Sequence, residues 1–238
     1  RSTNFDPGGF AEFIRVPKVN VETGTFLLPE GMSYEEGAFI EPVACVVRGQ
    51  RKAGVGPGKS VLIIGSGIAG ILHVQLARAY GAARVFATDI NDYRIEAARR
   101  FGADVAFRAT DDLPARLREL NGGYLPDVVI ACAGVPAAIS QALECVDRGG
   151  VILLFAPPPA GQICPMPLYD IWRDDITLVN TYAGAPADII EAIELIRTRK
   201  LNVLDMITHR LGLAETGRGF QLVAEGGASL KVIIEPQR

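Results

Sequence analysis

A glycine-rich hexapeptide at positions 65–70, GSGIAG, has the GxGxxG spacing of a loop that can hold the pyrophosphate of a dinucleotide. Residues 60–65 (SVLIIG) predict a strand buried on both faces, and residues 68–80 predict a helix that follows the turn. The first glycine permits a tight turn, the second lets a pyrophosphate approach the backbone, and the third lets helix and strand pack closely. Free amides at the helix start would then meet the anion. The expected cofactor contacts are Gly65, Gly67, Ile68, Ala69 and Gly70.

An acidic residue, Asp89, follows the next predicted strand, residues 85–88. A carboxylate at this place accepts hydrogen bonds from the hydroxyls of the adenosine ribose and would repel the 2′-phosphate of NADP. Ile90 and Asn91 come next in the chain, so no arginine occupies the position immediately beside the acid. The sequence therefore predicts that NAD is bound in preference to NADP.

Two other interpretations of the glycine loop exist. A tight turn without any ligand is one, and the combination of strand, helix and Asp89 argues against it. A methyltransferase that binds S-adenosylmethionine is the other, because it also uses a glycine-rich turn and an acid after the second strand. Such a sheet is closed by an antiparallel strand pair, and no such pair is evident in the sequence after Ile176.

A second candidate for chemistry is Glu41, which precedes Pro42 at the start of a helix predicted to run to about Lys52. The helix dipole favours a carboxylate at this end, where the side chain can point outward into a cleft. The same position suits a residue that only caps its own helix. A role in a metal or catalytic site and a capping role both stay open.

The elements that would position these residues alternate between short β-branched runs and helical patterns from Lys59 onward. This alternation requires parallel strands with crossover helices, so the predicted fold class is α/β with a doubly wound parallel sheet of the Rossmann type. The predicted strands are 60–65, 85–88, 105–107, 127–133, 151–155 and 176–182. The predicted helices are 68–80, 92–101, one beginning at Asp112, 136–147 and 187–199.

The two ends of the chain do not follow the alternation. Extended pieces at 10–16 and 26–28 and a lone strand at 230–234 suggest a second, mainly β domain, and the chain is expected to begin partway through something larger. Between them, Ser33 and Glu36 form a capping box. The expected domains are a remnant at 1–30, a nucleotide-binding domain at 31–199 and a return to the first domain at 200–238.

The composition of the chain limits the kinds of partner that it is expected to bind. The chain has 238 residues, 49% of them hydrophobic and 21% charged, with a formal net charge of −3 and no block of five like charges, which disfavours nucleic acid as a partner. Its apolar runs are too short to cross a bilayer, so no membrane partner and a cytoplasmic location are expected. The four cysteines have no metal or redox spacing; they are Cys45, Cys132, Cys145 and Cys164.

Three further motifs accompany the glycine loop and Asp89 in order: GGFAEF at 8–13, LPEGMSYEEGAFIEP at 28–42 and THRLGL at 208–213. With them the whole chain resembles the medium-chain dehydrogenase/reductase superfamily, in particular its zinc-dependent polyol and threonine dehydrogenase branch. The resemblance implies a Rossmann domain with remnants of a GroES-like β-barrel at both ends. The barrel's zinc-binding cysteine, His-Glu pair and four-cysteine lobe have no counterpart in this sequence, which is the main departure.

The resemblance also implies roles for single residues. Glu41 corresponds to a glutamate that binds the catalytic zinc or its water, Arg94 to a residue that covers the adenine, and Lys231 to a basic residue near the pyrophosphate. The run 176–182 is similar to the edge strand through which family members form dimers or tetramers. The implied cofactors are NAD and zinc.

The expected reaction is oxidation of a secondary alcohol of a polyol, sugar or amino alcohol to a ketone, with hydride passing to NAD⁺ and zinc polarising the alcohol oxygen. Because only Glu41 stands out as a zinc ligand, these 238 residues alone are expected to be inactive or nearly so. A zinc-free reductase similar to the quinone reductases is one alternative. A nucleotide-binding module without catalysis is the other.

Overall fold

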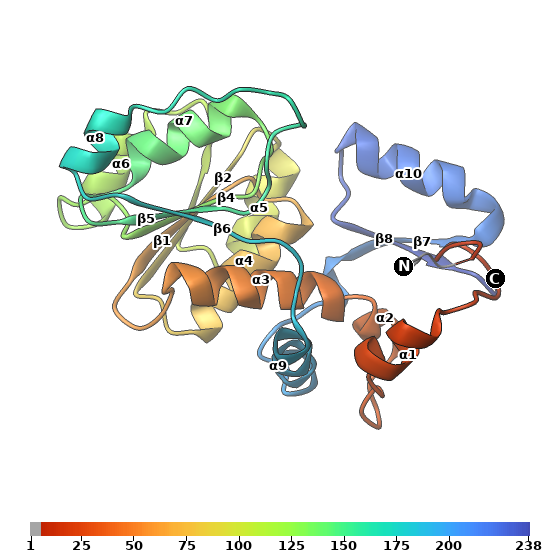
Figure 1. Ribbon diagram of the computed structural model, residues 1–238. Coiled ribbons are helices and arrows are strands. Elements are labelled where there is room, and N and C mark those ends of the chain that lie inside the picture. The colour runs from red at the N-terminus through yellow and green to blue at the C-terminus, as the bar shows by residue number, and fades with distance from the viewer. Residues whose placement is uncertain (1–5) are drawn as a thin grey trace. The chain divides into compact units, whose positions relative to one another are not determined.

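The computed structural model describes residues 6–238 and divides into two compact units (Figure 1). We call the unit Ile40–Asn202 the sheet unit, and we call the described residues 6–39 together with 203–238 the terminal unit. The sequence analysis expected boundaries after residues 30 and 199, and that domain assignment stays a prediction.

The sheet unit contains a six-stranded sheet in which every neighbouring pair is parallel. Its order, β3-β2-β1-β4-β5-β6, reverses between β1 and β4, which is the arrangement of a doubly wound fold. The predicted α/β class is therefore confirmed. The strands are β1 (Ser60–Ile64), β2 (Arg84–Asp89), β3 (Val105–Arg108), β4 (Val128–Ala131), β5 (Val151–Leu154) and β6 (Thr177–Asn180).

Helices cover both faces of this sheet (Figure 1). On one face α3 packs against α4 and α9, while α6 packs against α7 on the other. The helices of the unit are α3 (Ile40–Ala53), α4 (Ile68–Ala79), α5 (Asp92–Arg100), α6 (Leu113–Leu120), α7 (Pro136–Cys145), α8 (Leu168–Arg173) and α9 (Pro186–Arg197).

The core explains why the central strands are apolar along their whole length. All five residues of β1 are buried, as are all four of β4, because helices cover both sides. On the α6 and α7 side the buried cluster includes Leu62, Phe86, Phe107, Leu113, Leu117, Val129 and Ile152.

A buried charge fixes helix α9 to helix α3. The Asp188 side chain is fully buried and accepts a hydrogen bond from the Ala185 amide at 2.7 Å, which caps the start of α9. Its carboxylate also pairs with Arg51, and it lies 3.6 Å from an Arg48 guanidinium nitrogen. Both arginines are on α3, so a carboxylate that would be costly to bury alone holds the two helices together.

The two edge strands of the sheet differ in how they are covered. At β3, the Arg99 guanidinium donates to the Ala106 carbonyl oxygen at 2.6 Å, so this arginine covers part of the free edge. At β6, Thr177 and Leu178 are exposed, and Lys52 donates to the Asn180 carbonyl at 2.6 Å. One carbonyl of each edge strand is therefore occupied, and the two strands differ in that the residues of β6 are the more exposed.

In the terminal unit, β7 (Ile207–Gly212), α10 (Thr216–Glu225) and β8 (Lys231–Glu235) form a parallel strand–helix–strand unit. The short helices are α1 (Lys18–Gly24) and α2 (Tyr34–Gly37), with 3-10 turns at Leu204–Met206 and Leu213–Glu215. The predicted capping box is present, since Ser33 and Glu36 bond reciprocally at the start of α2.

Some expectations for the ends were wrong. The pieces 10–16 and 26–28 form no strand; residues Asp6 and Arg15 make an isolated bridge, and 18–24 is helical. The sequence analysis predicted no helix at 216–225, where Gly217 and Gly219 lower the intrinsic helix propensity. A Cβ at Gly219 would lie 3.0 Å from the Ile234 side chain, so that glycine permits close packing on β8.

Among the described residues, no helix has the length and apolar character that a bilayer crossing requires.

One histidine is enclosed completely. His73, on α4, has no exposed surface, and its Nδ1 lies 3.1 Å from the Gln50 amide nitrogen. Its ring meets Phe155 edge-on, with ring centroids 4.6 Å apart. Burial lowers the pKa of His73 to about 3, because desolvation penalises the imidazolium form.

We expect the stability of the protein to fall in acid because of His73. The unfolded chain protonates its histidine near pH 6.5 and the folded chain only near pH 3. Between these values the unfolded state binds the extra proton, so the free energy of unfolding loses up to about 1.4 kcal/mol per pH unit. Urea denaturation from pH 7 to pH 4 measures this slope. His73→Leu should remove its histidine component, whereas His209→Leu, at the only other histidine of the sequence, should leave it unchanged; equal slopes in all three proteins would contradict the assignment.

Candidate functional site

The glycine loop joins the end of β1 to the start of α4, at the carboxyl edge of the sheet. Gly65 has φ +92°, a left-handed conformation that favours glycine, and a Cβ there would lie 3.2 Å from the Ala133 Cβ. A Cβ at Gly70 would lie only 1.9 Å from the Gly65 carbonyl oxygen. The first and third glycines are therefore required by the fold itself.

The second glycine differs from the other two. Gly67 is the N-cap of α4 with an ordinary backbone conformation, and a Cβ placed there would meet nothing within 4 Å. No side chain of the described residues caps this helix end. The backbone amides of Ile68, Ala69 and Gly70 therefore belong to an uncapped helix start with open space beside Gly67, and such a start can receive an anion.

Asp89 ends β2, as predicted, and is 6% exposed. One carboxylate oxygen accepts the Ser66 amide at 2.7 Å, and the other accepts the Asn91 amide at 2.9 Å. The acid thus fixes the glycine loop on one side and the turn into α5 on the other, a structural role that the sequence analysis missed. Each oxygen retains a further lone pair that can accept a ribose hydroxyl.

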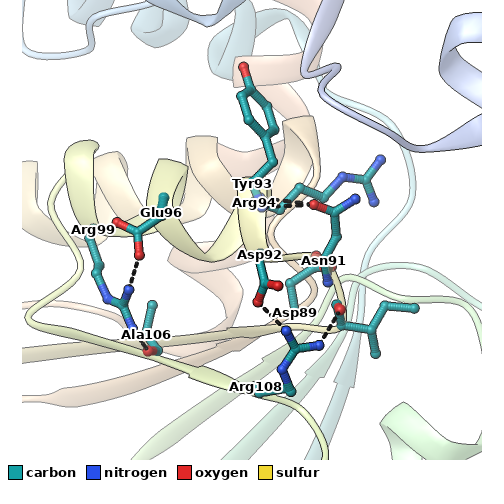
Figure 2. A network of polar contacts seen from close by, with 10 residues as sticks. Asp89, Asn91, Asp92, Tyr93, Arg94, Glu96, Arg99, Ala106 and Arg108 are labelled. Carbon is teal, nitrogen blue, oxygen red and sulfur yellow. Dashed lines mark hydrogen bonds and ion pairs between the residues drawn. The ribbon is translucent and has the colours of Figure 1, made fainter.

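Asn91 determines where helix α5 begins and so where Arg94 lies. The Asn91 side-chain oxygen accepts the backbone amides of Tyr93 at 2.9 Å and Arg94 at 3.4 Å. Arg94 lies in the first turn, and Figure 2 shows its guanidinium extending away from Asp92 and Arg108. Its Nε is buried without a hydrogen-bond partner among the described residues. The expected contact of Arg94 with adenine stays a prediction.

The structure brings an arginine beside Asp89 that the sequence analysis did not consider. Arg108, the last residue of β3, is the register partner of Asp89 in the neighbouring parallel strand. Its guanidinium donates to the Ile90 carbonyl oxygen at 3.1 Å and pairs with the Asp92 carboxylate (Figure 2). The reasoning that no arginine stands beside the acid is correct along the chain and wrong across the sheet. The sequence signal for Arg108 is its position at the end of the strand that follows β2, and a search of that position could have found it.

Glu41 lies in the first turn of α3, is exposed, and accepts a hydrogen bond from the Cys45 thiol at 3.2 Å. Burial and this contact raise the pKa of Cys45 to about 12, so the thiol keeps its proton and can donate to Glu41. Within the part of the chain that the structure describes, no three metal-binding side chains cluster. Glu41 alone does not make a zinc site, and its metal role stays a prediction.

Lys231 lies at the start of β8, in the terminal unit, whereas the glycine loop is in the sheet unit. Its Nζ lies 3.5 Å from the Ala38 carbonyl oxygen and 5.2 Å from the centroid of the Phe39 ring. The expected contact of Lys231 with the pyrophosphate stays a prediction.

The sheet order, the glycine loop after β1 and the acid at the end of β2 define a dinucleotide-binding domain of the Rossmann class. Comparison with known proteins gives the family. Residues 69–198 match the family described as zinc-binding dehydrogenase, and the chain belongs to it.

Individual relatives point the same way. Sorbitol dehydrogenase 1 of Saccharomyces cerevisiae is 31% identical over 215 residues, covering 87% of this chain and 60% of that protein. Sorbitol dehydrogenase of Gallus gallus is 28% identical over 215 residues, covering 88% and 59%. The chain therefore spans about 60% of the length of these curated relatives.

Two solved structures superpose well on this fold. One, described as a zinc-binding dehydrogenase from Sinorhizobium meliloti 1021 bound to NADP, is 28% identical with a TM-score of 0.85, covering 96% of this chain and 66% of that one. Galactitol-1-phosphate dehydrogenase from Escherichia coli is 28% identical with a TM-score of 0.83, covering 96% and 67%.

Replacing the third glycine should destabilise the fold, whereas replacing the second should not. We expect Gly70→Ala to lower the free energy of unfolding by about 1–3 kcal/mol or more, because the Gly65 carbonyl must move. Gly67→Ala, in open space, should remain within about 1 kcal/mol of the original protein. Urea denaturation measures both, and equal stabilities of the two variants would contradict the close approach of loop and helix.

Proposed function

We propose that this protein is an NAD-dependent polyol dehydrogenase, which oxidises a secondary alcohol of a polyol, sugar or amino alcohol to a ketone. The observation that carries the proposal is the open, uncapped helix start at Gly67 beside the buried carboxylate of Asp89. Family membership and the printed names of the relatives, sorbitol dehydrogenase and galactitol-1-phosphate dehydrogenase, support the substrate class.

The chain's own residues would bind and orient the cofactor. The first-turn amides of α4 bind the pyrophosphate, and Asp89 accepts the ribose hydroxyls with a carboxylate that is already held by two backbone amides. A site organised before binding loses little conformational freedom when the ligand arrives. This holds the nicotinamide in one orientation toward the substrate carbon.

When bound, NAD⁺ supplies the hydride acceptor. In the overall reaction the secondary alcohol would lose a hydride to that acceptor and its O–H proton to solvent, and would so become a ketone. The described residues contribute to this reaction by positioning the cofactor.

We propose Glu41 as one ligand of the zinc for which the family is named. An exposed carboxylate can ligate a divalent cation, and the Cys45 thiol restrains one of its oxygens at 3.2 Å. A catalytic zinc needs about three protein ligands, and the described residues do not supply such a set.

We also propose that two copies of the chain pair through the edge at 176–182. Leu178 is 38% exposed and Tyr182 is 92% exposed, and the residues of β6 are more exposed than those of β3. An open edge of this kind can add a strand from a second molecule.

Nucleotide binding gives the direct test. Titration of the protein with NADH, followed by nicotinamide fluorescence, should show saturable binding. Gly67→Val should weaken binding at least about tenfold, because its side chain fills the space that the pyrophosphate needs. Gly56→Val is the matched control, since a Cβ there also meets nothing within 4 Å; it should bind as the original does.

Failure to bind NADH, or equal weakening by both variants, would contradict the proposal. Binding of NADH by an enzyme that oxidises no polyol would instead favour the nucleotide-binding module. Metal analysis of an enzyme active on a polyol such as sorbitol separates the zinc enzyme from the zinc-free reductase.

The edge proposal predicts a change in assembly. Leu178→Lys should shift the protein from dimer or tetramer toward monomer in sedimentation velocity experiments, because it places a charge on the pairing edge. Tyr124→Lys, at a residue 69% exposed elsewhere on the sheet unit, is the control and should leave the assembly unchanged. A monomeric original protein would contradict the proposal.

A further inference from the structure

Three charged side chains lie together where the second and third strands of the sheet end. Asp89 closes β2, Arg108 closes β3 beside it, and Asp92 begins α5 (Figure 2). If the proposed function is right, Asp89 binds the adenosine ribose, so the other two lie at the position where NAD and NADP differ. The inference below rests on that proposed function and concerns its cofactor choice.

Arg108 has the exposure and the donors that phosphate binding requires, but the carboxylate of Asp92 neutralises its charge. Its side chain is 45% exposed, and a guanidinium has five N–H donors with a geometry that suits phosphate oxygens. Two of its nitrogens are engaged, one by the Ile90 carbonyl and one by the carboxylate of Asp92. The Ile90 contact leaves the positive charge in place, whereas the Asp92 contact neutralises it.

The acid of β2 cannot withdraw from a 2′-phosphate. Both Asp89 oxygens are held by backbone amides, those of Ser66 and Asn91, and the side chain is buried. Its negative charge is therefore a fixed repulsion. Arg108, in register with it, is the group that could offset that repulsion, and its charge decides the balance.

We propose that Asp92 sets the preference for NAD over NADP by neutralising Arg108. With Asp92 in place, a 2′-phosphate meets two carboxylates and one arginine already paired. With its charge removed, Arg108 can turn its donors to the phosphate. The pair is solvent-exposed, with Asp92 78% exposed, and such pairs are weak enough to open.

Arg94 is not a member of the Asp92 and Arg108 pair. It lies on the same helix as Asp92, but its guanidinium extends away from both Asp92 and Arg108 (Figure 2). The alternative role of the Asp92 and Arg108 pair is structural, tying the end of β3 to the start of α5. The two roles differ in one measurable quantity, the ratio of the affinities for NADPH and NADH.

The experiment compares four proteins with the original: Asp92→Asn, Arg108→Gln, the double variant Asp92→Asn with Arg108→Gln, and Glu96→Gln. Dissociation constants for NADH and NADPH are measured by fluorescence titration, and thermal unfolding checks that each protein is folded. Glu96→Gln is the matched control, because it removes one carboxylate from the same helix and frees a different arginine, Arg99.

We expect Asp92→Asn to raise the ratio of NADPH affinity to NADH affinity about tenfold, the size expected for a unit charge near a phosphate dianion in water. The gain should shrink at high salt because the contact is exposed. The double variant should lose the gain, and Glu96→Gln should leave the ratio unchanged.

An unchanged ratio in Asp92→Asn would overturn the inference, as would a gain that persists in the double variant or appears equally in Glu96→Gln. These results are distinct from failure of the proposed function. If the original protein binds neither nucleotide, the dinucleotide site itself is refuted, and the inference falls with it.

Discussion

The site depends on the carboxylate of Asp89, whose two oxygens accept backbone amides from two different segments. One amide belongs to the glycine loop and the other to the turn that starts α5. A buried carboxylate is stable only when its oxygens are satisfied, so the acid and the two segments hold one another in place. The group proposed to bind ribose is thus also the group that shapes the loop proposed to bind the pyrophosphate.

Much of the fold and of the glycine loop could be predicted from sequence, because the interactions that form these elements are local. The strand before Gly65, the left-handed turn there and the helix after it are encoded within a few consecutive residues. The capping box of Ser33 and Glu36 is local as well. The alternation of apolar strands and helices then determined the α/β class, since strands buried on both faces occur in parallel sheets.

What the sequence analysis missed depends on contacts between distant segments. Arg108 is next to Asp89 only because β2 and β3 pair in parallel register. Strand β7 pairs with β8, which follows α10 in the chain. Helix α10 packs on β8 through Gly219, a residue that lowers the helix propensity of α10. Glu41 is the opposite case, because its place at a helix start was predictable, whereas the described residues form no metal-binding cluster that would test its metal role.

The two edge strands of the sheet, β3 and β6, differ in exposure, and this affects how further molecules could add to the sheet. Each edge strand has one carbonyl occupied, that of Ala106 in β3 by Arg99 and that of Asn180 in β6 by Lys52, and the residues of β6 are the more exposed. If two molecules paired through β6, the only edge strand that each would leave unpaired in this sheet is β3. Such a pair is closed, and the same arginine that covers one carbonyl would limit the addition of further molecules into an open ribbon.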